Sequence, residues 1–128
     1  MPGPGQVRVL CVDNDPDLVG VTATFLERHD EGLEVVTATN AVDGLERVRF
    51  GDVDCVVSDY RMPGMDGLEF FGAVRETSPD LPFVLFTSEA GDALVSEATA
   101  AGVTDCIRKG GGPEQYVRLA SRIRDVVG

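Results

Sequence analysis

Residues 54–59 read DCVVSD and residues 82–87 read PFVLFT, two short apolar runs that each end at a polar side chain. Strands of a parallel sheet have this nearly continuous apolar composition, because helices cover both of their faces. Three further runs fit the pattern: VRVLCV at 7–12, LEVVTA at 33–38 and TDCIR at 104–108. The sequence therefore predicts five buried strands.

Amphipathic helices are predicted between the strands, because apolar residues recur there at three- and four-residue spacing. The predicted apolar faces are Leu18, Val21, Phe25 and Leu26; Val42, Leu45 and Val48; Leu68, Phe71 and Val74; Leu94, Ala98 and Ala101; and Tyr116, Leu119, Ala120, Ile123 and Val127. This alternation predicts an α/β fold, a flavodoxin-like (βα)5 sandwich. Its five-stranded parallel sheet has the order 2-1-3-4-5, with helices on both faces. The chain 1–128 is predicted to be one domain, with 1–6 as a flexible lead.

The composition is that of one ordinary globular domain, with 128 residues of which 43% are hydrophobic and 26% charged. No apolar run approaches the ~20 residues of a membrane span, and MPGPGQ at 1–6 lacks the features of a signal peptide. We therefore expect a cytoplasmic chain without membrane contact. The net charge of −11 would repel phosphate backbones, so direct nucleic-acid binding is not expected.

The basic residues and the cysteines are unusual in type or number. Ten of the eleven basic residues are arginines, and Lys109 is the single lysine. An acidic chain almost without lysine supports the hypothesis that the source is a halophilic organism. Cys11, Cys55 and Cys106 form an odd set without CxxC spacing, which argues against a disulfide framework or a zinc site. Each is expected to be a small buried apolar residue.

Polar residues stand where the predicted strands end, which is where open α/β sheets bind ligands. They are Asp13 and Asn14 after the first strand, Asp59 at the end of the third, Thr87 at the end of the fourth and Lys109 after the fifth. The first and third strands are neighbours in the predicted order, so the two carboxylates meet. Carboxylate and amide oxygens suit Mg²⁺, and a carboxylate can accept a phosphoryl group. A hydroxyl and an ammonium would then bind the phosphoryl oxygens.

The stretch VDNDPDLVG at 12–20 has an alternative interpretation as a self-contained calcium loop. An EF-hand loop counted from Asp13 needs glycine at its sixth position and glutamate at its twelfth. Those positions hold Leu18 and Thr24, so this interpretation fails. Asp15, which precedes a proline at a helix start, is expected to cap the helix.

Four motifs resemble the receiver domain of two-component response regulators over essentially the whole chain. They are VDND at 12–15, SDYRMPGMDG at 58–67, VLFTS at 84–88 and AGVTDCIRKG at 101–110. The second motif is highly specific for that family.

The resemblance implies a role for each site residue. It implies that Asp59 is the phosphoacceptor, Thr87 the switching hydroxyl and Lys109 the lysine that pairs with the phosphoryl group. It implies a Mg²⁺ site formed by Asp13, Asn14, Asp59 and the backbone carbonyl of Arg61. The residues expected to surround and modulate the site are Asp15, Ser88, Glu89 and Cys106.

The resemblance also implies a function. A sensor histidine kinase would donate a phosphoryl group to Asp59, and a downstream effector domain or protein would read the switched surface of the last two helices and the fifth strand. A phosphorylation-dependent homodimer is a further partner arrangement. Such a domain catalyses only its own phosphorylation and dephosphorylation and is not a metabolic enzyme. The alternative is a pseudo-receiver, a protein-interaction module without phosphate turnover. A phosphatase of another aspartyl-phosphate superfamily fits less well, because those enzymes place the nucleophile after the first strand and carry a substrate cap.

Three positions depart from the family pattern. Asn14 stands where an acid is usual, which predicts weaker Mg²⁺ binding. Cys106 replaces an aromatic residue, which leaves the signalling route through the fifth strand open. Gly110 replaces a proline after Lys109, so the preceding peptide bond is expected to be trans.

Arg61 and Glu89 each lie two residues past a site residue. By the resemblance these positions border the path of the hydrolytic water. We predict that the two side chains pair across the mouth of the site and slow the loss of the phosphoryl group.

Overall fold

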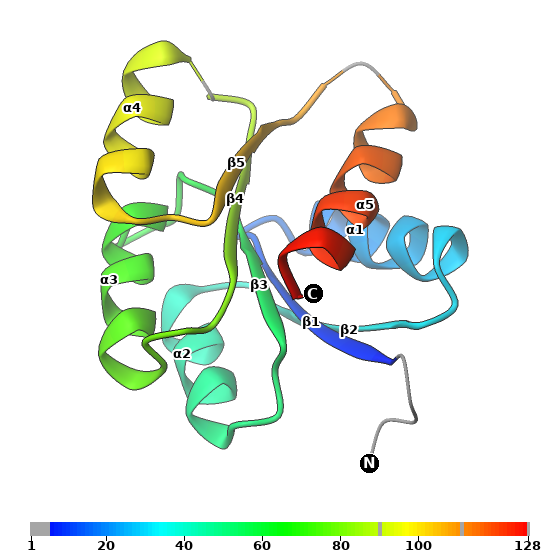
Figure 1. Ribbon diagram of the computed structural model, residues 1–128, viewed down its shortest axis with the longest axis horizontal. Helices are drawn as coiled ribbons and strands as arrows, with labels where there is room; N and C mark the ends of the chain where they lie inside the picture. Colours follow the sequence, from blue (N-terminus) through cyan, green and yellow to red (C-terminus); the bar gives the residue numbers. More distant parts are fainter. Residues whose placement is uncertain (1–5, 90, 111, 128) are drawn as a thin grey trace.

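The computed structural model describes residues 6–89, 91–110 and 112–127, in which five strands alternate with five helices (Figure 1). Most of the predicted lead, residues 1–5, lies outside the described residues. The strands are β1 (Val7–Val12), β2 (Leu33–Ala38), β3 (Cys55–Ser58), β4 (Phe83–Thr87) and β5 (Asp105–Arg108). The helices are α1 (Pro16–His29), α2 (Ala41–Phe50), α3 (Gly67–Thr77), α4 (Asp92–Ala101) and α5 (Glu114–Val127).

The strands form one parallel sheet in the order β2-β1-β3-β4-β5, which confirms the predicted topology. The register pairs Val12 of β1 with Ser58 of β3. Asp13 and Asp59 therefore follow paired residues at the carboxyl edge of two adjacent strands. This register places the two carboxylates side by side.

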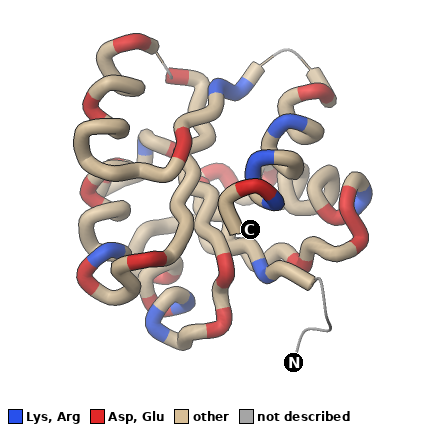
Figure 2. Tube along the Cα trace, in the orientation of Figure 1, with Lys and Arg blue, Asp and Glu red and all other residues tan. Residues whose placement is uncertain are grey.

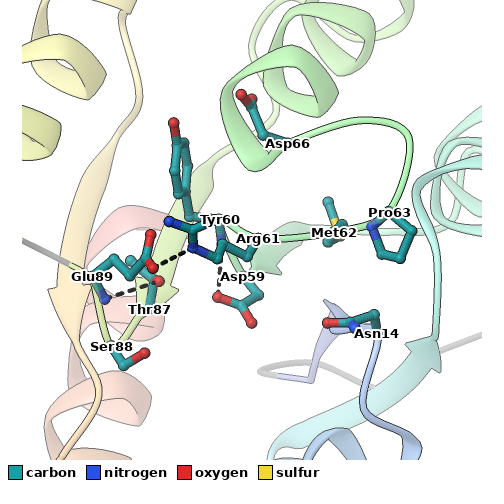
Figure 3. Close-up of a pocket in the computed structure, with 10 residues that line it drawn as sticks. All are labelled: Asn14, Asp59, Tyr60, Arg61, Met62, Pro63, Asp66, Thr87, Ser88 and Glu89. Atoms are coloured by element: carbon teal, nitrogen blue, oxygen red, sulfur yellow. Dashed lines mark hydrogen bonds and ion pairs between the residues drawn. The ribbon is translucent and has the colours of Figure 1, made fainter.

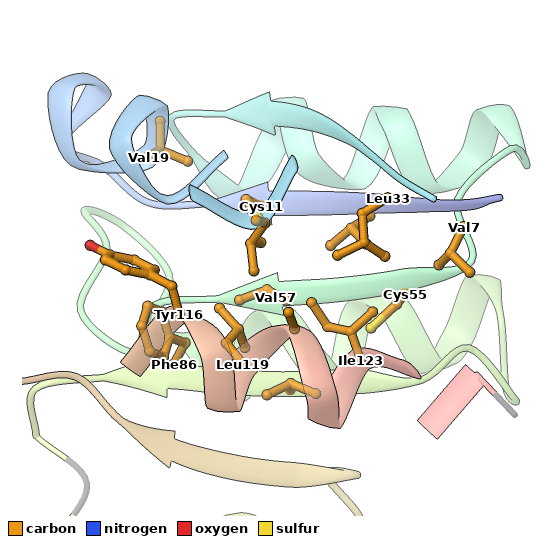
Figure 4. Packing of buried hydrophobic residues seen from close by; sticks show 14 residues of the cluster. Val7, Cys11, Val19, Leu33, Cys55, Val57, Phe86, Tyr116, Leu119 and Ile123 are labelled. Carbon is orange, nitrogen blue, oxygen red and sulfur yellow. The ribbon is translucent and has the colours of Figure 1, made fainter. Parts of the chain in front are cut away.

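Helices cover both faces of the sheet, with α1 and α5 on one side and α2, α3 and α4 on the other (Figure 1). Alternate strand residues pack toward opposite sides, because successive side chains of a strand point to opposite faces. Cys11, Val57 and Phe86 pack against α1 and α5 in the cluster drawn in Figure 4. Leu10 and Val56 belong to the second cluster, which packs against the other three helices. The central strands β1, β3 and β4 are thus buried on both faces, as their composition predicts. The prediction is wrong for the edge strands β2 and β5, which are only partly buried because each has a neighbouring strand on one side alone.

The predicted helix faces are correct for α5 and partly wrong for α1, α2 and α4. Tyr116, Leu119, Ala120 and Ile123 of α5 are buried as predicted, and Val127 is partly buried. In contrast, Val21 of α1 is 42% exposed and Val42 of α2 is 72% exposed. The buried faces of these two helices are Val19, Thr22 and Leu26, and Ala41, Gly44 and Val48.

A close helix–sheet approach explains the error in α2. A Cβ atom added at Gly44 would lie 3.0 Å from the Phe70 ring and 3.1 Å from the Val12 side chain. The helix thus packs through its glycine, which turns Val42 outward. In α1, Phe25 stacks on Tyr116 of α5 at a centroid distance of 4.8 Å and remains 37% exposed. Ala101 of α4 is also exposed, contrary to the prediction, and Ala98 is the buried residue of that helix.

Asp30 closes α1 and binds α5. Its carboxylate accepts hydrogen bonds from Arg124 Nε at 2.7 Å and Arg124 Nη2 at 2.9 Å, and from the Gly32 N–H. These bonds, and above all those from Arg124, lower the pKa of Asp30 to about 2. The ion pair therefore joins α5 to the C-terminal end of α1.

This ion pair predicts a pH-dependent stability difference. Because the folded-state pKa of Asp30 lies below its unfolded value, its contribution is complete above about pH 4 and disappears as the pH falls toward 2. We expect the free energy of unfolding of Asp30→Asn to be about 1 kcal/mol below that of the wild type at pH 7. Urea denaturation between pH 7 and pH 2 measures the difference, with Glu31→Gln as the control. A difference that persists unchanged at pH 2 would contradict the assignment.

Candidate functional site

The carboxyl edge of the sheet gathers Asp13, Asp59, Thr87 and Lys109, the four residues for which the sequence predicts this meeting. Thr87 is the last residue of β4, and the backbones of Asp13, Asp59 and Lys109 continue the ladder one residue beyond their strands. The Asp59 N–H donates to the Val12 carbonyl at 3.0 Å, and the Lys109 N–H donates to the Thr87 carbonyl at 2.9 Å. The side chains therefore start from a rigid base.

Lys109 lies between the two carboxylates. Its Nζ is 2.8 Å from Asp13 Oδ2 and 3.4 Å from Asp59 Oδ2, and it sits 5.5 Å above the centre of the Phe86 ring. The three charged side chains are only 10–16% exposed. Removal from water strengthens their mutual attraction, so the lysine compensates charges that would otherwise be costly to bury.

Backbone N–H groups fix the other oxygen of each carboxylate. The Tyr60 N–H donates to Asp59 Oδ1 at 2.7 Å, and the Asp15 N–H donates to Asp13 Oδ1 at 2.9 Å. Asp15 itself caps α1, since its Oδ1 accepts hydrogen bonds from the N–H groups of Asp17 and Leu18. The predicted capping role of Asp15 is confirmed.

Gly67 holds the loop after Asp59 in place, a role that the sequence analysis did not assign. Its N–H donates to the Tyr60 carbonyl at 2.6 Å. A Cβ atom there would lie 2.6 Å from the Asp59 carbonyl oxygen and 2.8 Å from the Leu85 side chain. Real Cβ atoms do not approach backbone so closely, so only glycine fits. The Met-Asp-Gly ending of the motif was the available signal.

Asp59 opens onto a hollow of about 570 Å³ (Figure 3). Asn14, Arg61, Thr87 and Ser88 are among its lining residues, and the amide end of Asn14 faces the Asp59 carboxylate in the figure. Asp13 is not part of this lining. It borders the small inner void beside Lys109 instead. A ligand in the hollow therefore reaches Asp59 directly, with Asn14 opposite.

Arg61 and Glu89 pair across this hollow. The Arg61 Nε donates to Glu89 Oε1, which joins the β3–α3 loop to the β4–α4 loop. The Glu89 backbone N–H also donates to Thr87 Oγ1 at 3.2 Å, and Thr87 is fully buried. The predicted pairing is confirmed, and the backbone of Glu89 also contacts the Thr87 hydroxyl.

The oxygen donors at this edge fit a Mg²⁺ ion that keeps several waters. They are the carboxylates of Asp13 and Asp59, the Asn14 amide and the Arg61 carbonyl. Within the described part of the chain, no three or more His, Cys, Asp or Glu side chains form a metal-binding group. The site thus offers two carboxylates, because position 14 is an amide. Such a small charge suits a hard cation held mostly by water.

Cys106 lies away from this hollow. It is half-buried beside a cavity of about 110 Å³ between α4 and β5, lined also by Val95, Ala98 and Val103. Burial raises the pKa of its thiol. Among the described residues there is no cis peptide bond, so the Lys109–Gly110 bond is trans as predicted.

A flavodoxin-like sheet that gathers two carboxylates, a buried hydroxyl and a lysine at its carboxyl edge defines an α/β domain with a charged site where such sheets bind ligands. The model of the response regulator receiver domain family matches residues 9–121, and the chain belongs to this family. Receiver domains have a phosphoacceptor role in two-component signalling. The chain is therefore a receiver domain of the kind found in signalling proteins.

Three relatives illustrate the similarity. The transcriptional regulatory protein GlrR of Escherichia coli is 34% identical over 102 residues, which cover 80% of this chain and 22% of GlrR. An uncharacterized 14.6 kDa protein of Leptolyngbya boryana is 34% identical, with 91% of this chain and 89% of that protein covered. The structure of the chemotaxis protein CheY4 of Vibrio cholerae matches with a TM-score of 0.81 at 29% identity, covering 92% of this chain and 98% of CheY4. The chain spans about a fifth of GlrR.

None of the described helices is long and apolar enough to span a membrane.

Proposed function

We propose that this chain is a phosphorylation-driven switch, in which Asp59 accepts a phosphoryl group from a sensor histidine kinase with Mg²⁺ present. The observation that carries the proposal is the position of Asp59. Of the two carboxylates bound to Lys109, it is the one that lines the open hollow. A donor phosphohistidine can therefore reach this carboxylate, whereas Asp13 does not line the hollow.

The transfer exchanges one bond for another. An Asp59 carboxylate oxygen attacks phosphorus, the P–N bond to the donor imidazole breaks, and its electron pair stays on the imidazole nitrogen. Mg²⁺, held by Asp13, Asn14, Asp59 and the Arg61 carbonyl, would neutralise charge on the phosphoryl oxygens.

Lys109 and Thr87 act on the transferred group. Lys109 lies 3.4 Å from Asp59 Oδ2, so it can turn from the carboxylates to a phosphoryl oxygen. Thr87 Oγ1 accepts a hydrogen bond from the Glu89 N–H. Its own proton is therefore free to be donated to the phosphoryl group, and this donation biases a two-state surface.

The proposed partners are proteins in the cytoplasm: the histidine kinase and an effector domain or protein, with a phosphorylation-dependent homodimer as a further arrangement. The net charge of −11 and the spread of acidic residues over the chain in Figure 2 support protein partners over nucleic acid. GlrR is a transcriptional regulatory protein, which supports an effector as the reader of the switch.

Beryllofluoride, which mimics a phosphoryl group on aspartate, tests the proposal. We expect saturable amide NMR shifts around Asp59, Thr87 and Lys109 in the wild type when Mg²⁺ is present. A spectrum that does not respond would favour the pseudo-receiver, for which Asn14 and Cys106 are the supporting residues.

Arg61→Ala is expected to lose its phosphoryl group about two- to fivefold faster than the wild type, the range that an exposed ion pair can contribute. Arg61 lines the hollow, where its guanidinium can pair with the phosphoryl group, so its loss admits the hydrolytic water. The decay of phosphorylated protein after removal of the donor measures the rate. Arg49→Ala, on an exposed position of α2, is the control. An unchanged rate in Arg61→Ala would count against a shielding role.

A further inference from the structure

Hydrogen bonds connect the Thr87 hydroxyl to the first turn of α4. The Glu89 N–H donates to Thr87 Oγ1 at 3.2 Å, and the Gly91 N–H donates to the Glu89 carbonyl at 2.7 Å. The Val95 N–H then donates to the Gly91 carbonyl at 3.0 Å. Glu89 thus stands between the buried hydroxyl and the helix, and its side chain is tied to Arg61.

Among the described residues, the N-terminus of α4 has no side-chain cap. Side chains cap α1, α2 and α3, namely Asp15, Asn40 and Asp66. The N-cap of α4 is Gly91, which has no side-chain hydrogen bond, and the buried residue of α4 is Ala98, far along the helix. An uncapped, mostly exposed helix has little local stability, so the loop before it sets the position of its first turn.

We propose that the Arg61–Glu89 ion pair is a latch that holds the first turn of α4 and the Thr87 hydroxyl in the unphosphorylated arrangement. Arg61 belongs to the loop that Gly67 fixes against α3, so it is the stationary half of the pair. Glu89 is the half that moves. Breaking the pair frees the β4–α4 loop without any change at Asp59.

The claim that phosphorylation opens the latch rests on the proposed function. The claim that the ion pair holds the unphosphorylated arrangement does not. A phosphoryl group on Asp59 adds a dianion to the hollow that Arg61 lines, and it competes with the single Glu89 carboxylate for the guanidinium. Thr87 turns toward the same group and gives up the Glu89 N–H. Both bonds of Glu89 are then released together.

The test is native-state hydrogen exchange of the Gly91 and Val95 amides in the metal-free, unphosphorylated chain. Both Glu89→Gln and Arg61→Gln are expected to exchange these two amides about two- to fivefold faster than the wild type at low salt. At ~1 M salt, where the screening length is about 3 Å, the wild type should approach the variants. Glu46→Gln and Arg49→Gln on α2 are the charge-matched controls and should follow the wild type.

The direction in which Glu89→Gln and Arg61→Gln change the exchange rate distinguishes a latch from a simple charge effect. A latch moves both variants the same way, although one loses a negative and the other a positive charge. Opposite changes, or exchange at the wild-type rate in both, would overturn the proposal. The two proposals can fail separately. If the wild-type spectrum does not respond to beryllofluoride but both variants exchange faster, the latch is supported and the phosphorylation switch is rejected. Unchanged melting temperatures of both variants are expected and would exclude global unfolding as the cause.

Discussion

Asp59→Asn is expected to reduce phosphorylation at least ~100-fold and to abolish the beryllofluoride response. The amide is a poor nucleophile, and it removes the one carboxylate that both contacts Lys109 and lines the hollow. The fold should remain, because Lys109 keeps its closer partner Asp13 at 2.8 Å. Intact mass after incubation with Mg²⁺ and a small phosphodonor measures the added phosphoryl group.

Two further variants sharpen this result. Asp17→Asn removes an exposed carboxylate from the first turn of α1 and should be phosphorylated like the wild type. Asp13→Asn keeps the acceptor but loses the closer lysine partner and a Mg²⁺ ligand, so it should be phosphorylated slowly. Wild-type phosphorylation of Asp59→Asn would place the acceptor at another residue and refute the assignment.

The site could be predicted from the sequence because topology does most of the positioning. Once the strand order is fixed, the residues at the carboxyl ends of β1, β3, β4 and β5 have to meet. Asp13, Asp59, Thr87 and Lys109 needed no knowledge of side-chain packing. The Arg61–Glu89 pairing was predicted from the family resemblance instead, which places both positions beside the path of the hydrolytic water.

What the sequence did not reveal depends on close packing. The outward turn of Val42 follows from the contact of Gly44 with Phe70 and Val12. Periodicity alone ranks valine above glycine as a core residue, so it selects the wrong face. The backbone bond from Glu89 to Thr87 was invisible for a similar reason, because a backbone N–H carries no sequence signal.

Asn14→Asp is expected to bind Mg²⁺ about tenfold more tightly than the wild type, a gain of about 1.4 kcal/mol. Unit charges 4 Å apart interact by about 4 kcal/mol at an effective dielectric constant of 20. Asn14 is exposed, so water screens most of this gain. Calorimetric Mg²⁺ titration of both proteins measures the difference.

The thermal stability of Asn14→Asp should depend on whether Mg²⁺ is present. This dependence distinguishes a metal ligand from a general charge effect. A third carboxylate beside Asp13 and Asp59 adds repulsion that Lys109 cannot fully offset, so metal-free Asn14→Asp should melt at a lower temperature than the wild type. Saturating Mg²⁺ should reverse that order, because an ion that binds the folded state more tightly stabilises it more. Asn40→Asp, which places the same charge on the N-cap of α2 and replaces an amide that donates to Asp43, should change the melting temperature by the same amount with and without Mg²⁺. Equal Mg²⁺ affinities of wild type and Asn14→Asp would mean that position 14 does not contact the ion, which would leave Asp13, Asp59 and the Arg61 carbonyl as its only protein ligands.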